Sequence, residues 1–402
     1  MLTGQKINFT YHGKNYAGTF ITSNEKTVTV KLENGYNITV NNNSISILGS
    51  SDAIETVESD TYRSKGVNGR DGIYIMTTGG TIGSSVDYKT GAVKPVKDIS
   101  YLYNFVNNIK DVKLYHENID NILSENVNPE RWINFARKAK NRMKDGNSII
   151  IFHGTDTMQY SAAALSFMFE EQTNPVIFTG SQRSSDRPSS DAFLNIEGAI
   201  HFAGMDKSVV GIAMHGSISD DYISLHNGVR ARKLHTSRRN AFTSVDTGEL
   251  ATYKNGKIKK HAIMKKASDR IILKDKLNSN VGIIYFYPGM PQEDFYNMAY
   301  SKDAVIILGT GLGHTSASII DVIKKLSRET HFFMTSQCIY GNVNLNVYST
   351  GRELLEAGVI PLGDMLAETA MVKAMFVLAN YPDELEKKMV ENMRGEINAK
   401  IR

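Results

Sequence analysis

Three loops of this chain combine glycine with hydroxyl-bearing side chains, a composition that lets the backbone approach a small polar ligand closely. They are "TTGGTIG" at 77–83, "HGTDTMQYS" at 153–161 and "TGSQRSSDRPSSD" at 179–191, and each follows an apolar run. The turn at Gly79-Gly80 has three interpretations. It is a phosphate cradle, an ordinary strand–turn–helix corner, or a turn that presents the Thr81 hydroxyl as a nucleophile.

The spacing of the glycines argues against a phosphate site. "TTGGTIG" lacks both the GxGxxG spacing and the GK[ST] ending of a P-loop, and "GTGLGH" at 309–314 also falls short of the dinucleotide pattern. An ordinary corner explains the glycines, but it does not predict the second threonine motif, "HGTDT", one strand away. We therefore favour a threonine nucleophile.

A threonine hydroxyl is a poor nucleophile at neutral pH and needs a neighbouring base. Thr155 and Asp156 lie on a loop that leaves a strand, so we expect them in the same crevice as Thr81. Lys233 is the base that the chain offers, because an amine withdrawn from water loses its proton more easily and Asp156 can orient it. The segment around it, "VRARKLHTSRRNAF" at 229–242, has two other interpretations, a solvated basic loop and a nucleic-acid contact.

Two further groups suit a small-molecule site. Tyr88 follows Thr81 by seven residues and can hydrogen-bond the nucleophile and pass a proton, although a lone tyrosine usually packs. Ser124 and Glu125 suit an amino-acid ligand, the carboxylate taking its ammonium group and the hydroxyl its carboxylate. The alternative for this pair is a simple turn at the start of a helix.

We expect no metal site. The ten histidines include no HExxH pattern, and a single cysteine supplies no thiolate pair. His153 stands at the end of a strand, where we interpret it as a structural histidine with satisfied hydrogen bonds.

The composition describes a globular protein of two or more domains. The chain has 402 residues, 41% of them hydrophobic and 22% charged, and its net charge of +4 permits an acidic or RNA partner without favouring one. One cysteine excludes an internal disulfide and favours a reducing compartment. The start, "MLTGQKINFT", lacks a signal-peptide pattern, and no apolar run approaches the roughly 18 residues of a membrane span. We expect a cytoplasmic protein without membrane contact.

The first 50 residues differ from the rest. They alternate apolar and polar residues with β-branched enrichment, and Asn34-Gly35 is a strong hairpin signal, so we predict a small, SH3-like all-β barrel at 1–50. A linker rich in Ser, Asp and Glu follows at 51–70. Beyond it, continuous apolar runs alternate with helical patterns, which predicts an α/β fold with buried, mainly parallel sheets.

Two details of the α/β region can be argued from single residues. Asn128 at the cap position and Pro129 at the first helical position predict a helix that ends at Asp145-Gly146. The Lys-rich, poorly patterned stretch from Ala251 to Asn280 predicts a boundary between a larger domain at 71–265 and a smaller α/β domain at 280–402.

Taken in order, these motifs resemble the bacterial-type L-asparaginase/glutaminase family. "TTGGTIG", "YKTG" from Tyr88, the Ser-Glu dipeptide, "HGTDT" and the later lysine hold their order over residues 72 to about 400. The resemblance implies a two-domain asparaginase-like α/β fold whose larger domain carries the catalytic loops.

A narrower similarity is to the D subunits of archaeal glutamyl-tRNA(Gln) amidotransferases, carried by "LENGYNITV", "GSQRSSDRPSSDAFLNIEGAI" and "TSQCIYGNVNLNVYSTGRELLEAGVIP". It implies a glutamine amidohydrolase that releases ammonia for a partner, the E subunit, in a heterotetramer of two D and two E subunits with a homodimeric core. The partner would use ATP and Mg²⁺ to amidate glutamate on tRNA(Gln). No cofactor is implied for this chain itself.

The resemblance also implies roles for single residues. The catalytic set is Thr81, Tyr88, Thr155, Asp156 and Lys233, with Thr81 favoured over Thr155 as the nucleophile. The substrate-binding set is Ser124, Glu125, Gly80 and Gly154, the glycines offering backbone N–H groups to an oxyanion.

Three functions compete at this point. The first is the glutamine-hydrolysing component of the amidotransferase, and the second is a free-standing L-asparaginase/glutaminase with an added β domain. The third, a catalytically silent binding or RNA-adaptor protein, fits poorly with an intact nucleophile, base and orienting carboxylate. Glutamine and asparagine differ by one methylene, worth only about 1–3 kcal/mol, so the sequence does not decide between them.

Overall fold

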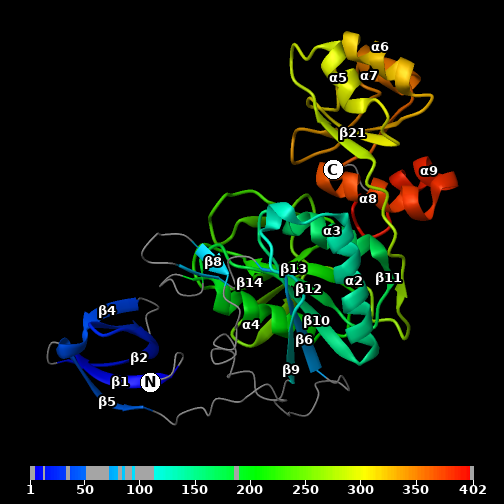
Figure 1. Ribbon diagram of the computed structural model, residues 1–402. Coiled ribbons are helices and arrows are strands. Elements are labelled where there is room, and N and C mark those ends of the chain that lie inside the picture. The colour runs from blue at the N-terminus through cyan, green and yellow to red at the C-terminus, as the bar shows by residue number, and fades with distance from the viewer. Residues whose placement is uncertain are drawn as a thin grey trace.

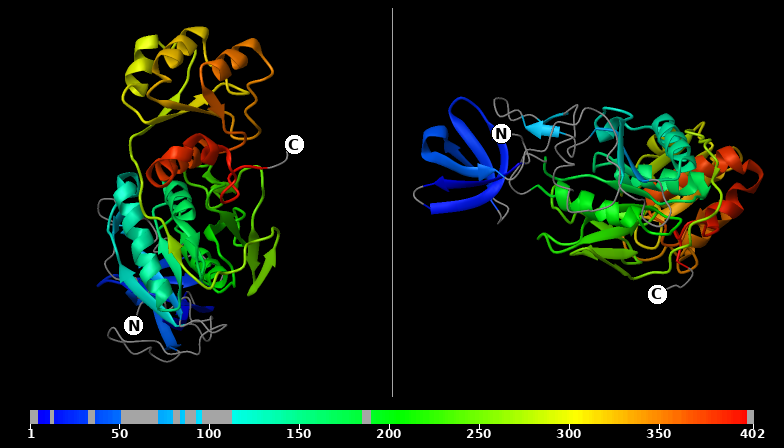
Figure 2. Two further views of the ribbon diagram at one scale, coloured as in Figure 1. Left: turned by 90° about the vertical axis from the view of Figure 1, so that its right-hand side faces the viewer. Right: turned by 90° about the horizontal axis from the view of Figure 1, so that it is seen from below.

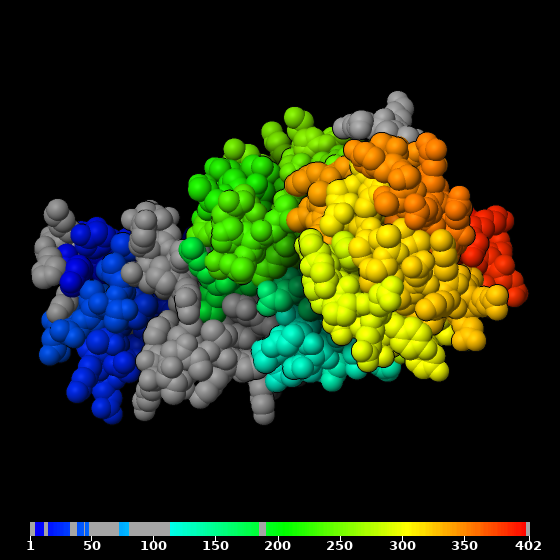
Figure 3. Space-filling model, turned by 90° about the horizontal axis from the view of Figure 1, so that it is seen from above, coloured from blue at the N-terminus to red at the C-terminus, as the bar shows by residue number. Residues whose placement is uncertain are grey.

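A computed structural model describes residues 5–11, 14–32, 37–50, 72–79, 84–86, 93–95, 113–184 and 190–398. Within them, an N-terminal β sheet precedes a large α/β unit and a smaller one (Figure 1). Figure 3 shows the N-terminal strands, in blue, at the end of the molecule opposite residues of the smaller unit, in yellow and orange.

The N-terminal unit is a five-stranded antiparallel sheet in the order β4-β3-β2-β1-β5. Its strands are β1 (Lys6–Tyr11), β2 (Lys14–Ser23), β3 (Thr27–Leu32), β4 (Asn37–Asn41) and β5 (Ile45–Ser50), with a 3-10 turn, η1 (Asn42–Ser44). Phe9, Phe20 and Val30 fill its core, so the predicted small β unit is confirmed. The β3–β4 hairpin is confirmed too, although Asn34 and Gly35 lie outside the described residues.

The large unit is built on a sheet in the order β18-β17-β14-β13-β12-β10-β6-β9, whose last five members are parallel. Its strands are β6 (Gly72–Thr77), β9 (Leu114–Asn118), β10 (Asn147–Phe152), β12 (Val176–Thr179), β13 (Val210–His215), β14 (Ile223–Asn227), β17 (Ala251–Lys254) and β18 (Lys257–Lys260). Alternate residues of β10 enter two different cores, Ile149 on one face and Ile150 on the other. Burial on both faces is why the strands are continuous apolar runs.

Helices cover both faces of this sheet (Figure 2). They are α2 (Pro129–Lys144) and α3 (Met158–Met168) on one face and α4 (Ala192–Ala203) on the other. The helix predicted after Asn128 is confirmed as α2, since the Asn128 Oδ1 atom accepts from the N–H of Arg131 at 3.1 Å.

The Lys-rich stretch after Ala251 is more ordered than its composition indicates. Its first ten residues form the β17–β18 hairpin at the edge of the large sheet. Lysines on an edge strand discourage pairing with another chain, which suits the lysines of this hairpin to its place at the edge of the sheet.

The smaller unit has a four-stranded parallel sheet in the order β20-β21-β22-β23. Its elements are β20 (Val281–Tyr285), α5 (Gln292–Ala299), β21 (Ala304–Gly309), α6 (Ala317–Leu326), β22 (His331–Ser336), α7 (Ser349–Glu356) and β23 (Val359–Pro361). The chain continues with α8 (Ala367–Asn380), η5 (Pro382–Glu384) and α9 (Leu385–Val390). Helix α8 lies between the two units and shares a core with α3, where the rings of Phe167 and Phe376 stack (Figure 1).

Short elements complete the described chain. They are β7 (Ser84–Val86) with β8 (Val93–Pro95), β11 (Phe169–Glu171) with β19 (Ile272–Leu273), β15 (Ala231–Lys233) with β16 (Phe242–Ser244), and the 3-10 turn η4 (Ser124–Asn126). No helix among the described residues is long and apolar enough to cross a membrane.

Candidate active site

The predicted loops leave neighbouring parallel strands on the same side of the large sheet. This edge of the sheet is formed by the carboxyl ends of its parallel strands, and not by an outer strand. β10 pairs with β6 on one side and β12 on the other, so the ends of all three adjoin. At this edge the N–H and the hydroxyl of Thr78 both donate to the Phe152 carbonyl, each at 3.0 Å. Gly79 has φ +105°, and a Cβ there would lie 2.5 Å from the Ile122 carbonyl oxygen, so this turn requires glycine.

Three of the predicted catalytic residues meet at this edge. The Lys233 Nζ atom, at the end of β15, donates to Thr155 Oγ1 at 2.8 Å and to Asp156 Oδ1 at 2.7 Å. The Lys233 side chain is 8% exposed, whereas that of Asp156 is 69% exposed. An amine in this position is shielded from water yet oriented by a carboxylate, as expected from the sequence. The solvated-loop interpretation is therefore wrong for Lys233.

The Thr155 loop is closely packed from the β12 side. A Cβ at Gly180 would lie 2.6 Å from the His153 carbonyl oxygen and 3.0 Å from Thr155 Cγ2, so only glycine leaves room for the loop. The Thr155 hydroxyl consequently has a defined place opposite Lys233.

Ser124 and Glu125 form the turn η4, which contacts the same loop. A Cβ at Gly154 would lie 2.6 Å from Ser124 Cβ, and the Thr157 hydroxyl donates to the Ser124 carbonyl at 2.6 Å. Ser124 is buried and Glu125 is exposed. The structure therefore places the predicted substrate pair beside Gly154, with its carboxylate directed to solvent.

Three other predicted residues, Gly80, Thr81 and Tyr88, lie outside the described residues. Their placement relative to Lys233 stays a prediction. The described part of the chain holds no cluster of three or more His, Cys, Asp and Glu side chains suited to a metal ion.

A buried hydrogen-bond relay supports the "HGTDT" loop from below. The Trp132 indole N–H donates to Ser161 Oγ at 2.9 Å, Ser161 Oγ contacts His153 Nε2 at 2.9 Å, and His153 Nδ1 contacts the Gly154 carbonyl at 2.7 Å. Because the Gly154 carbonyl only accepts, the proton of the neutral ring is on Nδ1, and Nε2 accepts from the Ser161 hydroxyl. Burial lowers the pKa of His153 to about 4. The interpretation of His153 as structural is confirmed, but Ser161 and Trp132 carried no local signal.

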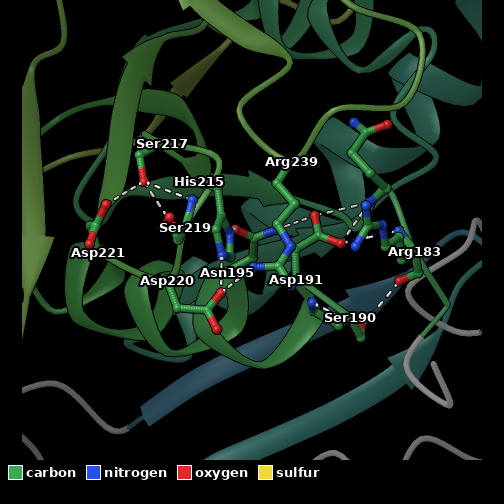
Figure 4. Close-up of polar contacts among 12 residues, drawn as sticks. Arg183, Ser190, Asp191, Asn195, His215, Ser217, Ser219, Asp220, Asp221 and Arg239 are labelled. Atoms are coloured by element: carbon green, nitrogen blue, oxygen red, sulfur yellow. Dashed lines mark hydrogen bonds and ion pairs between the residues drawn. The ribbon is translucent and has the colours of Figure 1, made fainter. Parts of the chain in front are cut away.

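A second network holds the β12–α4 loop (Figure 4). The Asp191 carboxylate accepts the backbone N–H groups of Gln182 at 3.0 Å and Arg183 at 3.1 Å, and the Asn195 side chain donates to the Gly180 carbonyl at 2.9 Å. These bonds keep Gly180 against the Thr155 loop. Sequence reasoning noted the segment for its hydroxyl groups, whereas the buried Asp191 and Asn195 organise it.

Three of the four arginines around Lys233 are held in ion pairs, and the fourth, Arg238, is exposed. Arg230 is fully buried and pairs with Asp364 at 3.0 Å, Arg232 pairs with Glu368 at 2.5 Å, and Arg239 contacts Asp220 at 2.5 Å. The nucleic-acid interpretation is therefore wrong for Arg230, which solvent does not reach.

Comparison with known proteins gives the class first. The family described as "Asparaginase, N-terminal" matches residues 72–265, and "Glutaminase/Asparaginase C-terminal domain" matches residues 280–390. The L-asparaginase from Thermococcus kodakarensis superimposes with a TM-score of 0.74 at 30% identity, over 82% of this chain and 99% of that one. L-asparaginase I from Vibrio cholerae gives 0.70 at 28% identity, with the same coverage. The fold is that of the asparaginase class of amidohydrolases.

The relatives that match nearly the whole length of the chain identify a narrower family. The D subunit of the glutamyl-tRNA(Gln) amidotransferase from Thermoplasma volcanium is 47% identical, covering 98% of this chain and 97% of that protein. The corresponding D subunit from Pyrococcus furiosus is 42% identical, covering 92% and 87%. A match over 98% of the chain must include most of the N-terminal sheet. The chain belongs to the asparaginase family and, within it, to the family of glutamyl-tRNA(Gln) amidotransferase D subunits.

Proposed function

We propose that this chain is the glutamine amidohydrolase of a tRNA-dependent amidotransferase. It releases ammonia from the glutamine side chain, and an ATP- and Mg²⁺-using partner, the E subunit, uses that ammonia to convert Glu-tRNA(Gln) to Gln-tRNA(Gln). The observation that carries the proposal is the contact of Lys233 Nζ with Thr155 and Asp156, in a chain related to D subunits along nearly its full length. The active assembly is a heterotetramer of two D and two E subunits.

In the proposed reaction, the Thr81 hydroxyl attacks the carboxamide carbon of glutamine. Its proton passes to the set formed by Thr155, Lys233 and Asp156, with the Tyr88 phenol as a partner. Backbone N–H groups at Gly80 and Gly154 stabilise the tetrahedral oxyanion. The C–N bond then breaks and the nitrogen leaves as ammonia after taking a proton, and water hydrolyses the threonine ester to glutamate.

Ser124 and Glu125 hold the α end of the substrate. The exposed Glu125 carboxylate pairs with the ammonium group, and the Ser124 hydroxyl donates to the α-carboxylate. This orients the carboxamide toward the threonines, and the proximity it provides lowers the entropic cost of attack.

The test is ammonia release by the full-length chain, measured alone, with its co-expressed partner protein, and with both the partner and Glu-tRNA(Gln). We expect glutamine hydrolysis to rise when partner and tRNA are present, and we expect the chain to co-purify with a second protein. Sustained asparagine hydrolysis by the chain alone, unaffected by partner or tRNA, would instead identify a free-standing asparaginase.

A further inference from the structure

Two arginines lie near Lys233 in the chain, Arg230 in the turn before β15 and Arg232 within β15. Side chains alternate along a strand, so Arg232 points away from the site when Lys233 points into it. Both arginines reach the segment at the start of α8, where Arg230 meets Asp364 and Arg232 meets Glu368.

The contact with the start of α8 extends into the turn that precedes β15. The Thr369 hydroxyl donates to the Val229 carbonyl at 3.0 Å, and Arg230 also donates to the Asp364 carbonyl at 2.9 Å. Residues 364–369 thus contact residues 229, 230 and 232. We call residues 364–369, at the start of α8, the platform of the Lys233 strand.

Glu368 is the unusual member of this platform. Its side chain is 3% exposed, and its Oε1 atom has no hydrogen-bond partner among the described residues. Burial raises the pKa of Glu368, and the charge of Arg232 opposes that rise. Keeping a half-satisfied carboxylate at this depth costs stability, so a gain other than stability accounts for it.

The same helix also supports the other half of the site. α3 begins directly after the Thr155–Asp156 loop and packs against α8. Tyr160, in the first turn of α3, lies close enough to Glu368 for its charge to act with burial in raising the Tyr160 pKa. α8 therefore supports both the loop with Thr155, through α3, and the strand with Lys233, through Arg232.

We propose that Arg232 and Glu368 are positioning residues, whose ion pair, between a 33% exposed arginine and a buried carboxylate, holds Lys233 Nζ where it reaches both Thr155 and Asp156. This inference rests on the proposed function, because that function gives the Lys233 amine its role in proton transfer. A positioning role explains why a buried carboxylate pairs with the residue next to Lys233.

The test uses the double variant R232M/E368M in the full-length chain with its partner protein. Removing both members of the pair leaves no buried charge unpaired, so we expect an unfolding midpoint at or above that of the parent. We expect kcat for glutamine to fall on the order of tenfold to a hundredfold, since a displacement of about 1 Å has that effect, with little change in KM. A double variant with normal kcat and stable fold would overturn the proposal.

A second readout does not depend on activity. Acetic anhydride labels exposed amines, and the rate at Lys233 can be followed by peptide mass spectrometry. We expect slow labelling of Lys233 in the parent and several-fold faster labelling in R232M/E368M, with Lys373, a fully buried lysine, unchanged in both. Equal Lys233 labelling rates in both proteins would count against a positioning role.

Two controls separate this inference from the proposed function. R270M/E171M removes another Arg–Glu pair, in which the arginine side chain is 67% exposed, and should leave kcat and labelling unchanged. K233M should abolish hydrolysis if the proposed function holds. If the parent complex released no ammonia, the proposed function would fail, while the labelling rates would still decide whether Arg232 and Glu368 position Lys233.

Discussion

At the scale of the residue, Lys233 contacts two oxygen atoms with one amine. Its Nζ lies 2.8 Å from the Thr155 hydroxyl and 2.7 Å from the Asp156 carboxylate. In the proposed reaction the amine takes a proton from the hydroxyl, and the negative charge of the carboxylate stabilises the ammonium group that results. This geometry serves either threonine. It activates Thr155 directly, or it makes Thr155 the acceptor for a proton lost by Thr81.

The two threonines can be separated by trapping. A diazoketone analogue of glutamine alkylates the attacking oxygen, and peptide mass spectrometry identifies the residue. We expect an adduct on Thr81 in the parent and none in T81V, whose glutamine hydrolysis should fall by at least on the order of a thousandfold because no nucleophile remains. Valine keeps the volume of threonine, so circular dichroism should be unchanged. An adduct on Thr155 would reverse the assignment.

At the scale of the element, the "HGTDT" loop is held by two helices and a strand. The relay from Trp132 on α2 through Ser161 on α3 to His153 after β10 has one hydrogen-bond direction, and it ends on the Gly154 carbonyl. A neutral His153 is a condition for this direction, because a protonated ring cannot accept at Nε2.

The relay predicts a pH dependence of stability. The pKa of His153 is about 4 in the folded chain against an ordinary 6.5, so the unfolded chain binds more protons between these values. The contribution of His153 to the free energy of unfolding is therefore fully present above pH 6.5. It is lost as the pH falls toward 4, by on the order of 3 kcal/mol. Urea midpoints measured between about pH 7 and pH 4.5 should fall less steeply in H153Q than in the parent.

The matched control for this prediction is H261Q, because His261 is exposed and its ring contacts the Thr252 hydroxyl at the edge of the large sheet. It should follow the parent at every pH. Parallel slopes for H153Q and the parent would exclude His153 as a source of acid sensitivity.

At the scale of the whole molecule, the N-terminal sheet contacts the large unit through a lysine. The Lys31 amine, on β3, lies 4.7 Å from the centre of the Phe193 ring on α4. Burial lowers the pKa of Lys31, and the charge of Asp220 opposes this. Asp220 in turn contacts Arg239 and the buried His215, part of the network that holds the β12–α4 loop (Figure 4).

We expect K31M to loosen this contact without changing glutamine hydrolysis by the complex, since Lys31 lies against Phe193 and not against Thr155, Asp156 or Lys233. A cation over an aromatic ring contributes about 0.5–2 kcal/mol, so amide hydrogen exchange in α4 near Phe193 should become faster. K26M, on the exposed turn before β3, is the control and should not alter it. Unchanged exchange in K31M would show that the contact contributes nothing to docking.

Much of this architecture follows from the sequence because it is local. Apolar runs predicted the parallel strands, Asn128-Pro129 predicted the start of α2, and "HGTDT" predicted the loop that Lys233 contacts. The edge hairpin β17–β18 was not predicted, because lysine-rich edge strands lack the apolar pattern of buried ones.

The tertiary structure decided what each charge near Lys233 contacts. By composition, residues 229–242 equally describe a solvated loop, a nucleic-acid contact and a catalytic strand. The partners lie far away in the chain, since Thr155 is 78 residues from Lys233, and Asp364 and Glu368 are 134 and 136 residues from their arginines. Local periodicity reports which side chains are buried, whereas the partner of a buried charge depends on how sheets and helices come together. That is why the sequence alone predicted the chemistry of the site, and only the fold determined which side chains Lys233 and its neighbouring arginines contact.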